Sequence, residues 1–344
     1  MRWLITNRNV TSSGFGTDFA DMTFWLQEQP TANAWDWSAW TKVTLDAFKT
    51  ALVAAADQFP PPLTTSPDQQ KQVAILVHGY NNAWDAAMRL HDRVERNLFS
   101  GANSLGVVVS FDWPSKGSLL GYLPDRSEAR QSAEDLSDVL SELYDWLSVK
   151  QTQAAKNPQD ACKAKTTLIA HSMGNYVLEC AMNYTWTQKN RPLLVSLLQE
   201  VLMVAADVDN DIFRFGETVE HGDGEGIANL SYRVTALYTG RDAVLGSSAG
   251  LKHFGKRRLG RSGLDKTCPV PDNVWDVDCS SLLNPNVNGI EIHGEYFADG
   301  EEKVYSLMRS ILQGVDRGVL ISEGLVPNAN PRQQSVNSGS TETN

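Results

Sequence analysis

Continuous apolar runs alternate along this chain with longer segments in which apolar residues recur every three to four positions. Runs typical of strands buried on both faces of a sheet lie at 72–77, 106–111, 166–169 and 201–206. Helical spacing covers residues 83–98 and 126–147 between them. Strands that alternate with helices predict a mostly parallel sheet with helices on both faces, which is an α/β fold.

Weaker patterns complete the predicted order of elements. Further strands are expected at 2–6, 23–26, 232–238 and 287–292, and further helices at 43–59, 175–182, 192–199 and 301–315. Residues 216–229 and 244–279 are expected to be mainly loop. Residues 1–325 are expected to form a single domain, and residues 326–344, rich in Asn, Ser, Gln and Thr, a disordered tail.

Residues 166–177, TTLIAHSMGNYV, combine a strand, a tight turn and a helix around Ser172. A serine between small residues on such a turn is the nucleophile elbow pattern, in which a strained backbone presents the hydroxyl at the end of the strand. Here the first small residue is Ala170 rather than glycine, and the second is Gly174. A short pattern of this kind also occurs by chance, but the flanking strand and helix favour a nucleophilic Ser172.

Ligands of parallel sheets bind at the carboxyl ends of the strands. The residues at these ends include a serine, two histidines and several aspartates, namely His78, Gly79, Tyr80, Asp112, Trp113, Ser172, Asp207, Asp242 and His293. A serine hydroxyl needs a base within hydrogen-bond reach, and the base needs an orienting partner. The predicted topology therefore brings together the residue types that nucleophilic catalysis requires.

The expected chain order for this architecture is serine, acid, histidine. His221 lies in a glycine-rich loop and His253 in a basic stretch, whereas His293 follows the last predicted strand, so His293 is the favoured base. Asp242 is the favoured acid. Asp207 and Asp209 remain alternatives, although Asp209 is also placed to cap a helix.

The expected oxyanion donors are the backbone N–H groups of Met173 and Tyr80. We interpret His78 as a brace for the loop that carries Tyr80, although it is also a possible second base. Side chains near the strand ends that are candidates for contact with a substrate are His78, Gly79, Trp84, Trp113 and Tyr122. The aromatic residues among them fit core packing equally well. Trp35, Trp37 and Trp40 are expected to form a packing layer rather than a ligand cage.

Charge and cysteine content narrow the functional classes. The net charge is −11, which makes nucleic acid an unexpected partner. The basic group Lys252, Lys256, Arg257, Arg258 and Arg261 is expected to be a solvated face rather than an anion site. No run of eighteen apolar residues and no signal-peptide pattern occurs, so a cytoplasmic protein without a membrane span is expected.

The four cysteines lack the spacing of zinc ligands, and no metal or organic cofactor is expected. Cys268 and Cys279 bracket a short loop and could be joined if oxidised, but a cytosolic protein would normally keep them reduced. Whether they are joined is left open.

Five segments together resemble an uncharacterised family of bacterial α/β-hydrolases in the esterase/lipase superfamily. They are TNR at 6–8, VHGYN at 77–81, FDWPS at 111–115, AHSMGN at 170–175 and YTGRDA at 238–243. The resemblance covers roughly residues 1–320 and implies the α/β-hydrolase fold and a Ser172–Asp242–His293 triad. The HGEYF segment at 293–297 is similar to the family's histidine segment.

The predicted activity is hydrolysis of small carboxylic esters, of short to medium acyl chain because no long apolar lid is evident. An amidase, thioesterase or acyltransferase would use the same triad. A non-catalytic binding protein that keeps the fold is the alternative from another class, and it predicts a missing triad member.

Overall fold

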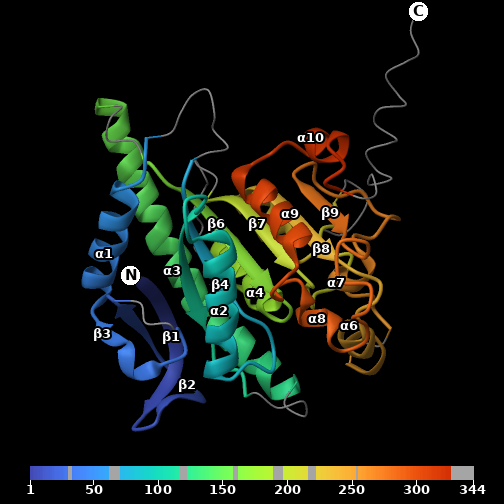
Figure 1. The fold of residues 1–344 in the computed structure, drawn as a ribbon, viewed down its shortest axis with the longest axis horizontal. Helices are drawn as coiled ribbons and strands as arrows, with labels where there is room; N and C mark the ends of the chain where they lie inside the picture. Colours follow the sequence, from blue (N-terminus) through green and yellow to red (C-terminus); the bar gives the residue numbers. More distant parts are fainter. Residues whose placement is uncertain are drawn as a thin grey trace, which may run out of the picture.

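The computed structural model contains a nine-stranded sheet, in which neighbouring strands follow the order β3-β2-β1-β5-β4-β6-β7-β8-β9 (Figure 1). The structure describes residues 1–29, 33–61, 70–116, 122–157, 162–188, 197–215, 222–252 and 255–326. The strands β1, β5, β4, β6, β7, β8 and β9, which are neighbours in this order, pair in parallel. Strand β2 pairs antiparallel with both β1 and β3. The predicted mostly parallel α/β sheet is therefore confirmed.

The strands are β1 Arg2–Thr11, β2 Gly14–Gln27, β3 Thr41–Val43, β4 Gln72–Val77, β5 Gly106–Asp112, β6 Lys165–His171, β7 Leu198–Val204, β8 Ser231–Tyr238 and β9 Val274–Asp278. The helices are α1 Leu45–Asp57, α2 Trp84–Leu98, α3 Tyr122–Lys156, α4 Gly174–Gln188, α5 Glu225–Leu230, α6 Ala243–Ser247, α7 Leu259–Ser262, α8 Ile292–Glu295, α9 Glu302–Gln313 and α10 Arg317–Ser322. A 3₁₀ turn covers Trp37–Ala39, and a π-helical turn covers Ser248–Lys252.

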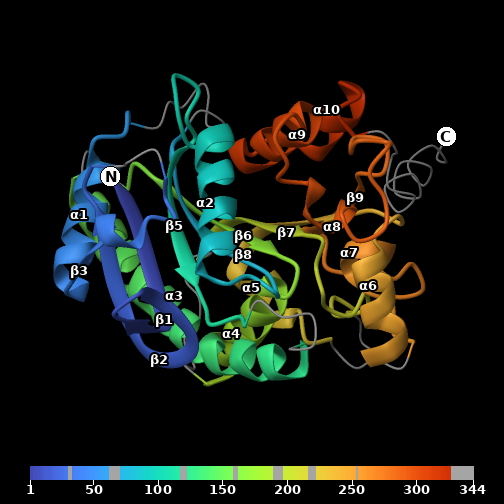
Figure 2. The same ribbon diagram turned by 60° about the horizontal axis from the view of Figure 1, so that its bottom comes forward.

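Helices cover both faces of the sheet (Figure 2). On one face, α2 and α9 pack on the apolar side chains of β4, β5 and β7 in one cluster that includes Leu76 and Leu202. On the other, α1, α3, α4 and α5 pack in a larger cluster that includes Ile75 and Leu168. In the parallel register, Ile75 on β4 lies opposite Val109 on β5 and Leu168 on β6. The central strands are buried on both faces, as their continuous apolar runs predicted.

Local signals account for the ends of several helices. The Thr44 side chain accepts a hydrogen bond from the Ala47 N–H at 3.2 Å and so caps α1. Gly314 follows α9 with φ of 91°, a left-handed conformation that glycine adopts without a steric penalty. The predicted strand at 72–77 is confirmed residue for residue, and α3 is longer at both ends than the predicted helix at 126–147.

The predictions for two segments on either side of β7 were partly wrong. The expected helix at 192–199 ends inside β7, which begins at Leu198, and its residues up to 196 lie outside the described chain. The expected loop at 216–229 ends in helix α5, and residues 216–221 are likewise outside it. Gly226 in α5 is buried, and a Cβ there would lie 2.7 Å from the Met182 carbonyl oxygen. This glycine permits a close approach of α5 to α4, so it does not mark a loop.

The last strand was predicted in the wrong place. Residues 287–292 do not form a strand: Gly289 has φ of 70° and makes one isolated bridge to Asp242, and α8 begins at Ile292. The sheet instead ends at β9, which lies within the segment 244–279 that we expected to be mainly loop. Two aspartates in the β9 sequence VWDVD concealed it, although Asp276 is buried because it accepts a hydrogen bond from the Leu264 N–H at 2.8 Å.

The structure also bears on three other expectations, which concern the carboxyl-terminal tail, the cysteines and the tryptophans. Val326, assigned to the tail, is only 5% exposed and packs in the core, whereas 327–344 lie outside the described residues; the single-domain assignment stays a prediction. All four cysteine thiols are free. Trp40 is buried, but Trp37 is 37% exposed, so the tryptophan layer is only partly a packing layer.

Candidate active site

Ser172 lies in the turn between β6 and α4 with a strained backbone. Its φ is 53°, in the left-handed region that non-glycine residues rarely adopt. The turn is held because the Ser172 N–H donates to the Val204 carbonyl oxygen at 3.0 Å and the Asp207 N–H donates to the Ser172 carbonyl oxygen at 3.1 Å. The elbow geometry that the sequence predicted is therefore present, and the carboxyl end of β7 supports it.

Small residues are required around this turn, as the pattern indicated. A Cβ on Gly174 would lie 2.5 Å from the His78 carbonyl oxygen, and a Cβ on Gly79 would lie 2.6 Å from the Ser172 Cβ. Gly79 therefore packs directly against the candidate nucleophile. Ala170 is fully buried, so its methyl group fits where many such turns have glycine.

His293 links the hydroxyl of Ser172 to the carboxylate of Asp242. Its Nε2 lies 2.7 Å from Ser172 Oγ, and its Nδ1 lies 2.6 Å from Asp242 Oδ2. A carboxylate can only accept a hydrogen bond, so Nδ1 carries the proton and Nε2 is left to accept from the hydroxyl. The structure thus brings together the three residues that the sequence predicted as nucleophile, base and acid.

The Asp242 carboxylate is fixed by a second contact. Its Oδ1 accepts from the Leu245 N–H at 3.0 Å, which caps α6, and the side chain is fully buried. The guanidinium of Arg261 donates to the Asp242 carbonyl oxygen. Asp242 is therefore a helix cap through one oxygen and a histidine partner through the other, with little rotational freedom left.

Asp207 and Asp209, the alternative acids, belong to a separate ion-pair network. Arg258 Nε lies 2.8 Å from Asp207 Oδ1, Tyr122 donates to Asp207 Oδ2 at 2.9 Å, and Asp209 pairs with Arg258 and Lys256. Burial alone would raise the pKa of Asp207, but the adjacent Arg258 charge and the hydrogen bonds hold it below its usual value. The geometry favours Asp242 as the histidine's partner.

Arg258 also overturns one expectation from the sequence. It is fully buried, whereas we expected the basic group to be a solvated face. The expectation holds for Lys256 and Arg257, which are exposed. Asp209 does not cap a helix either, because residues 210–213 form a turn. Ion pairs between residues about fifty positions apart leave no local signal, so the sequence could not reveal them.

His78 braces the loop next to the elbow. Its Nδ1 lies 2.9 Å from the Gly79 carbonyl oxygen, and its Nε2 lies 2.9 Å from Asp112 Oδ1. The ring stacks on Trp113 with an interplanar angle of 2°. These contacts favour the bracing interpretation over a role as a second base.

Arg8, part of the TNR segment at 6–8, is a second buried brace, a role that the sequence did not reveal. Its guanidinium is fully buried, lies 2.8 Å from Asp112 Oδ2 and donates to the carbonyl oxygens of Asn82 and Ser115. Burial would raise the pKa of Asp112, but the Arg8 and His78 side chains hold it below its usual value. Arg8 thereby ties β1 to the two loops that follow β4 and β5.

The two expected oxyanion donors lie beside Ser172. Met173 follows it at the amino end of α4, and within the described part of the chain its N–H donates no hydrogen bond. Tyr80 follows Gly79, which touches the Ser172 side chain, and Asn81 next to it has a left-handed φ of 61°. Strained backbone at both loops is typical of functional turns.

His171 is a further buried histidine at the site that the sequence did not identify. Its Nε2 lies 3.0 Å from the His293 carbonyl oxygen, and its ring packs edge-on against Phe297. Burial, and then the proximity of His293, lower the pKa of His171 to about 3. His171 is therefore neutral near pH 7 and positions His293 without adding a charge.

The aromatic residues suggested as substrate contacts are mostly packed. Trp113 is fully buried against His78, and Trp84 packs on Phe15 with centroids 4.2 Å apart in a separate cluster. Tyr122 is 5% exposed, and its hydroxyl is bonded to Asp207. The structure favours the packing alternative for all three. His221 and His253, the other candidate bases, lie outside the described residues.

Neither a metal-binding cluster nor a membrane-spanning helix is found among the described residues. No group of three or more His, Cys, Asp or Glu side chains there could hold a metal ion. Among the same residues, no helix is long and apolar enough to cross a membrane.

A mostly parallel sheet with helices on both faces and an elbow serine after β6 define an α/β-hydrolase. The comparison with protein families agrees: residues 57–270 match the family described as "Alpha/beta hydrolase of unknown function (DUF900)". This match covers more than half of the chain, so the protein belongs to that family. Ser172 and Asp242 lie inside the matched region, and His293 lies beyond it.

Individual relatives are more distant. An uncharacterized protein of Nostoc sp. is 30% identical over 129 residues, which are 31% of this chain and 30% of that protein. Among solved structures, Aspergillus fumigatus lipase B is 12% identical with a TM-score of 0.41, over 83% of this chain and 62% of that one. The esterase domain of a Rhodothermus marinus protein is 10% identical with a TM-score of 0.39, over 91% and 98%. The chain thus spans under a third of the Nostoc protein and under two thirds of the lipase.

Proposed function

We propose that this α/β-hydrolase cleaves small carboxylic esters through an acyl-serine intermediate, with Ser172 as nucleophile, His293 as general base and Asp242 as its orienting acid. The observation that carries the proposal is the unbroken hydrogen-bonded chain Ser172 Oγ–His293 Nε2 and His293 Nδ1–Asp242 Oδ2, at 2.7 and 2.6 Å. Both distances lie within the range that proton transfer between a nucleophile and its base requires.

In the acylation half, His293 Nε2 takes the hydroxyl proton as Ser172 Oγ bonds to the carbonyl carbon of the ester. Asp242 stabilises the imidazolium that forms. The N–H groups of Met173 and Tyr80 are the proposed donors to the oxyanion. The bond to the leaving oxygen then breaks, and His293 returns the proton to the departing alcohol.

In the deacylation half, water attacks the acyl-serine, and His293 accepts the proton of that water. The second tetrahedral intermediate collapses, Ser172 Oγ leaves and takes back the proton from His293, and the carboxylic acid is released. Every proton is accounted for by the three residues and the substrate, so the scheme requires no cofactor.

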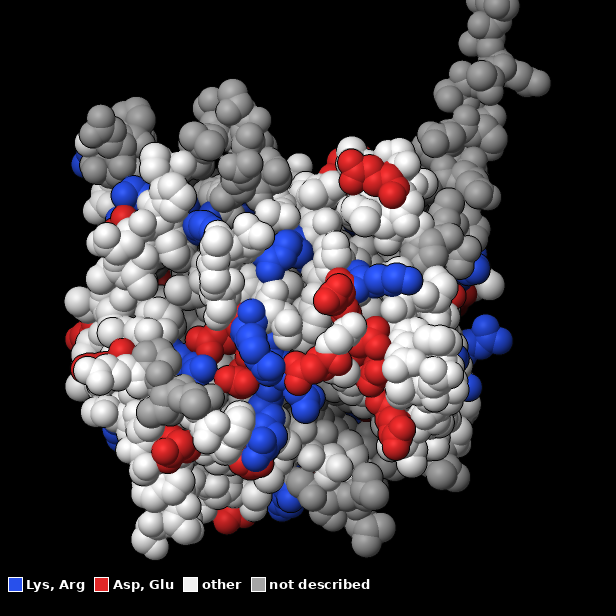
Figure 3. All heavy atoms as spheres, viewed as in Figure 1, with Lys and Arg blue, Asp and Glu red and all other residues white. Residues whose placement is uncertain are grey.

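Charge supports a small-molecule substrate rather than a polyanion. Figure 3 shows Lys and Arg side chains interspersed with Asp and Glu in the middle of the face it presents, around α2. There Arg89 pairs with Asp85, and Arg96 pairs with Asp92 and Asp299. On the face shown, these mixed charges do not form the continuous basic surface that nucleic-acid binding requires.

An amidase, a thioesterase and an acyltransferase would use the same triad, because the leaving group and the acceptor depend on the pocket and not on the three residues. A non-catalytic binding role is disfavoured because the triad members are all present and mutually hydrogen-bonded. The acyl-chain preference, short to medium, rests on the sequence alone.

The test is hydrolysis of p-nitrophenyl esters from acetate to palmitate by the wild type, Ser172→Ala and the exposed control Ser322→Ala on α10. The proposal predicts loss of activity on the order of 10⁴-fold or more in Ser172→Ala and wild-type activity in the control. A folded wild type inactive on all esters but active on thioesters or amides would replace the ester assignment. Equal activity of Ser172→Ala and the wild type would remove Ser172 from the mechanism.

A further inference from the structure

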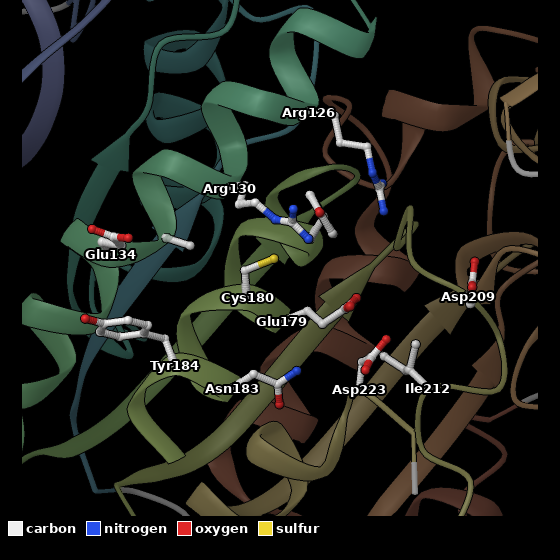
Figure 4. Close-up of a pocket in the computed structure, with 12 residues that line it drawn as sticks. Arg126, Arg130, Glu134, Glu179, Cys180, Asn183, Tyr184, Asp209, Ile212 and Asp223 are labelled. Atoms are coloured by element: carbon white, nitrogen blue, oxygen red, sulfur yellow. The ribbon is translucent and has the colours of Figure 1, made fainter. Parts of the chain in front are cut away.

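A polar cavity of about 480 Å³ lies between α3, α4 and the segment that follows β7 (Figure 4). Tyr176, Glu179 and Asn183 line it from α4, Arg126 lines it from α3, and Asp223 lines it from the segment before α5. None of the three triad residues lines it. The cavity is therefore distinct from the proposed catalytic site, although it begins one helical turn after Ser172.

Glu179 is a buried carboxyl group without a hydrogen-bond partner. Glu179 is only 9% exposed, and its carboxyl group forms no hydrogen bond or ion pair with any described residue. Figure 4 shows its carboxylate and that of Asp223 pointing toward one another in the cavity. Burial, and then the charge of Asp223, raise the pKa of Glu179 to about 8. The carboxyl group therefore faces the cavity without a protein partner, and a ligand with a donor group could bind it there.

Arg126 is the complementary feature on the opposite wall. Its guanidinium lies 3.5 Å from the centroid of the Tyr176 ring, which holds the plane of the group. Its Nη1 is buried and has no hydrogen-bond partner. Since a guanidinium can only donate, the missing partner must be an acceptor, and an anion suits it best.

A ligand that carries only a positive or only a negative charge would pair with one wall of the cavity and leave the other wall unpaired. An anion bonded to Arg126 would face Glu179 and Asp223, and a simple amine beside the two carboxyl groups would leave Arg126 Nη1 unpaired. A metal ion is disfavoured because no three-ligand group is found in the described residues and because Arg126 would repel it. A ligand with both charges satisfies both walls at once.

We propose that this cavity binds a small amino-acid-like zwitterion, with its ammonium group between Glu179 and Asp223 and its carboxylate on Arg126. Binding is accompanied by release of a proton at pH 7, since the ammonium group stabilises the ionised form of Glu179. The proposal does not depend on the activity of Ser172.

The test is isothermal titration calorimetry of the full chain with a series of ω-amino acids from glycine to 6-aminohexanoate, which samples the spacing between the two charges. The matched alkylamines and alkylcarboxylates are titrated in parallel, and each titration is repeated in buffers of different ionisation enthalpy. We expect at least one zwitterion to bind at least about tenfold more tightly than its amine or carboxylate counterpart and to release a proton.

Three variants and one control locate the ligand. Glu179→Gln is expected to weaken zwitterion binding at least tenfold and to abolish proton release, and Arg126→Gln is expected to bind the zwitterion no better than the amine. Asp223→Asn, at an exposed position, weakens binding too and serves if Glu179→Gln does not fold. Glu302→Gln, an exposed charge change on α9, is expected to bind as the wild type does.

Three results would overturn the proposal: no zwitterion of the series binds, the amine or the carboxylate binds as tightly as the zwitterion, or Glu179→Gln binds unchanged. Ser172→Ala separates the two sites. Unchanged zwitterion affinity in this variant, whatever its effect on esterolysis, supports a separate site, whereas a large loss of affinity would assign the cavity to the catalytic centre.

Discussion

The ring of His171 packs against His293, with centroids 5.1 Å apart, and its Nε2 lies 3.0 Å from the His293 carbonyl oxygen. His171, which directly precedes Ser172 in the chain, is neutral and forms a hydrogen bond with the backbone of His293, the candidate base. His293 lies in the short helix α8, and this contact and the bond to Asp242 hold it there.

His171→Phe is expected to reduce kcat roughly two- to tenfold, since it keeps a ring but removes one hydrogen bond worth about 0.5–1.5 kcal/mol. The acid limb of the pH–rate profile should stay in place, because the pKa of His171 is already lowered to about 3 and the residue does not titrate between pH 5 and 8. Steady-state kinetics from pH 5 to 9 check both points. A shift of the acid limb by a full pH unit would contradict a neutral positioning role.

Asp242→Asn and Asp207→Asn separate the triad acid from its neighbour. The first is expected to lower kcat by about 10⁴-fold with the fold retained, since asparagine favours the wrong histidine tautomer. The second breaks a buried pair with Arg258 and is expected to cost about 3–5 kcal/mol of stability with a smaller effect on kcat of the folded fraction. Steady-state kinetics and urea unfolding of both variants measure the two effects. A larger loss of kcat in Asp207→Asn than in Asp242→Asn would make Asp207 the triad acid.

Gly79→Ala tests the close approach of the loop after β4 to the elbow. The added Cβ would lie 2.6 Å from the Ser172 Cβ, so we expect kcat/KM to fall at least about a hundredfold. Gly250→Ala is the matched control, because a Cβ there meets nothing within 4 Å. Near-wild-type activity in Gly79→Ala would show that the loop can move away from Ser172 at little cost.

His91 is predicted to contribute to acid sensitivity. It lies on the buried face of α2, with Nδ1 2.8 Å from Ser110 Oγ. Burial, and then the charge of Arg2, lower the pKa of His91 to about 3. Between about pH 3 and 6.5, the unfolded chain binds a proton at His91 that the folded chain does not bind. The contribution of the buried neutral His91 to stability is therefore fully present above pH 6.5 and is lost as the pH falls towards 3.

The His91→Gln variant should therefore have an unfolding free energy that falls less steeply with acidification, by up to about 1.4 kcal/mol per pH unit between pH 6 and 4. Urea unfolding at several pH values measures the slope. Parallel slopes for the variant and the wild type would mean that His91 is protonated in the folded state.

Much of this molecule could be predicted from its sequence because the signals are local. Strand β4 and the turn at Ser172 follow from runs of adjacent residues. His293 was chosen because it comes after the serine and the acid and was placed after a strand at 287–292, but these residues do not form a strand. Strand β9 was missed because its buried Asp276 is satisfied by the Leu264 N–H, a partner that only the fold supplies. Arg8 and Arg258 were missed as buried braces for the same reason, since their carboxylate partners lie 104 and 51 positions away.

The most direct test of the central claim is covalent labelling of Ser172. The protein is treated with a fluorophosphonate, which reacts with activated serine hydroxyls, and the product is examined by intact mass and peptide mapping. We expect a single adduct on the peptide that contains Ser172, absent from Ser172→Ala and formed far more slowly by Asp242→Asn. No adduct on the folded wild type, or an equal adduct on Ser172→Ala, would contradict it.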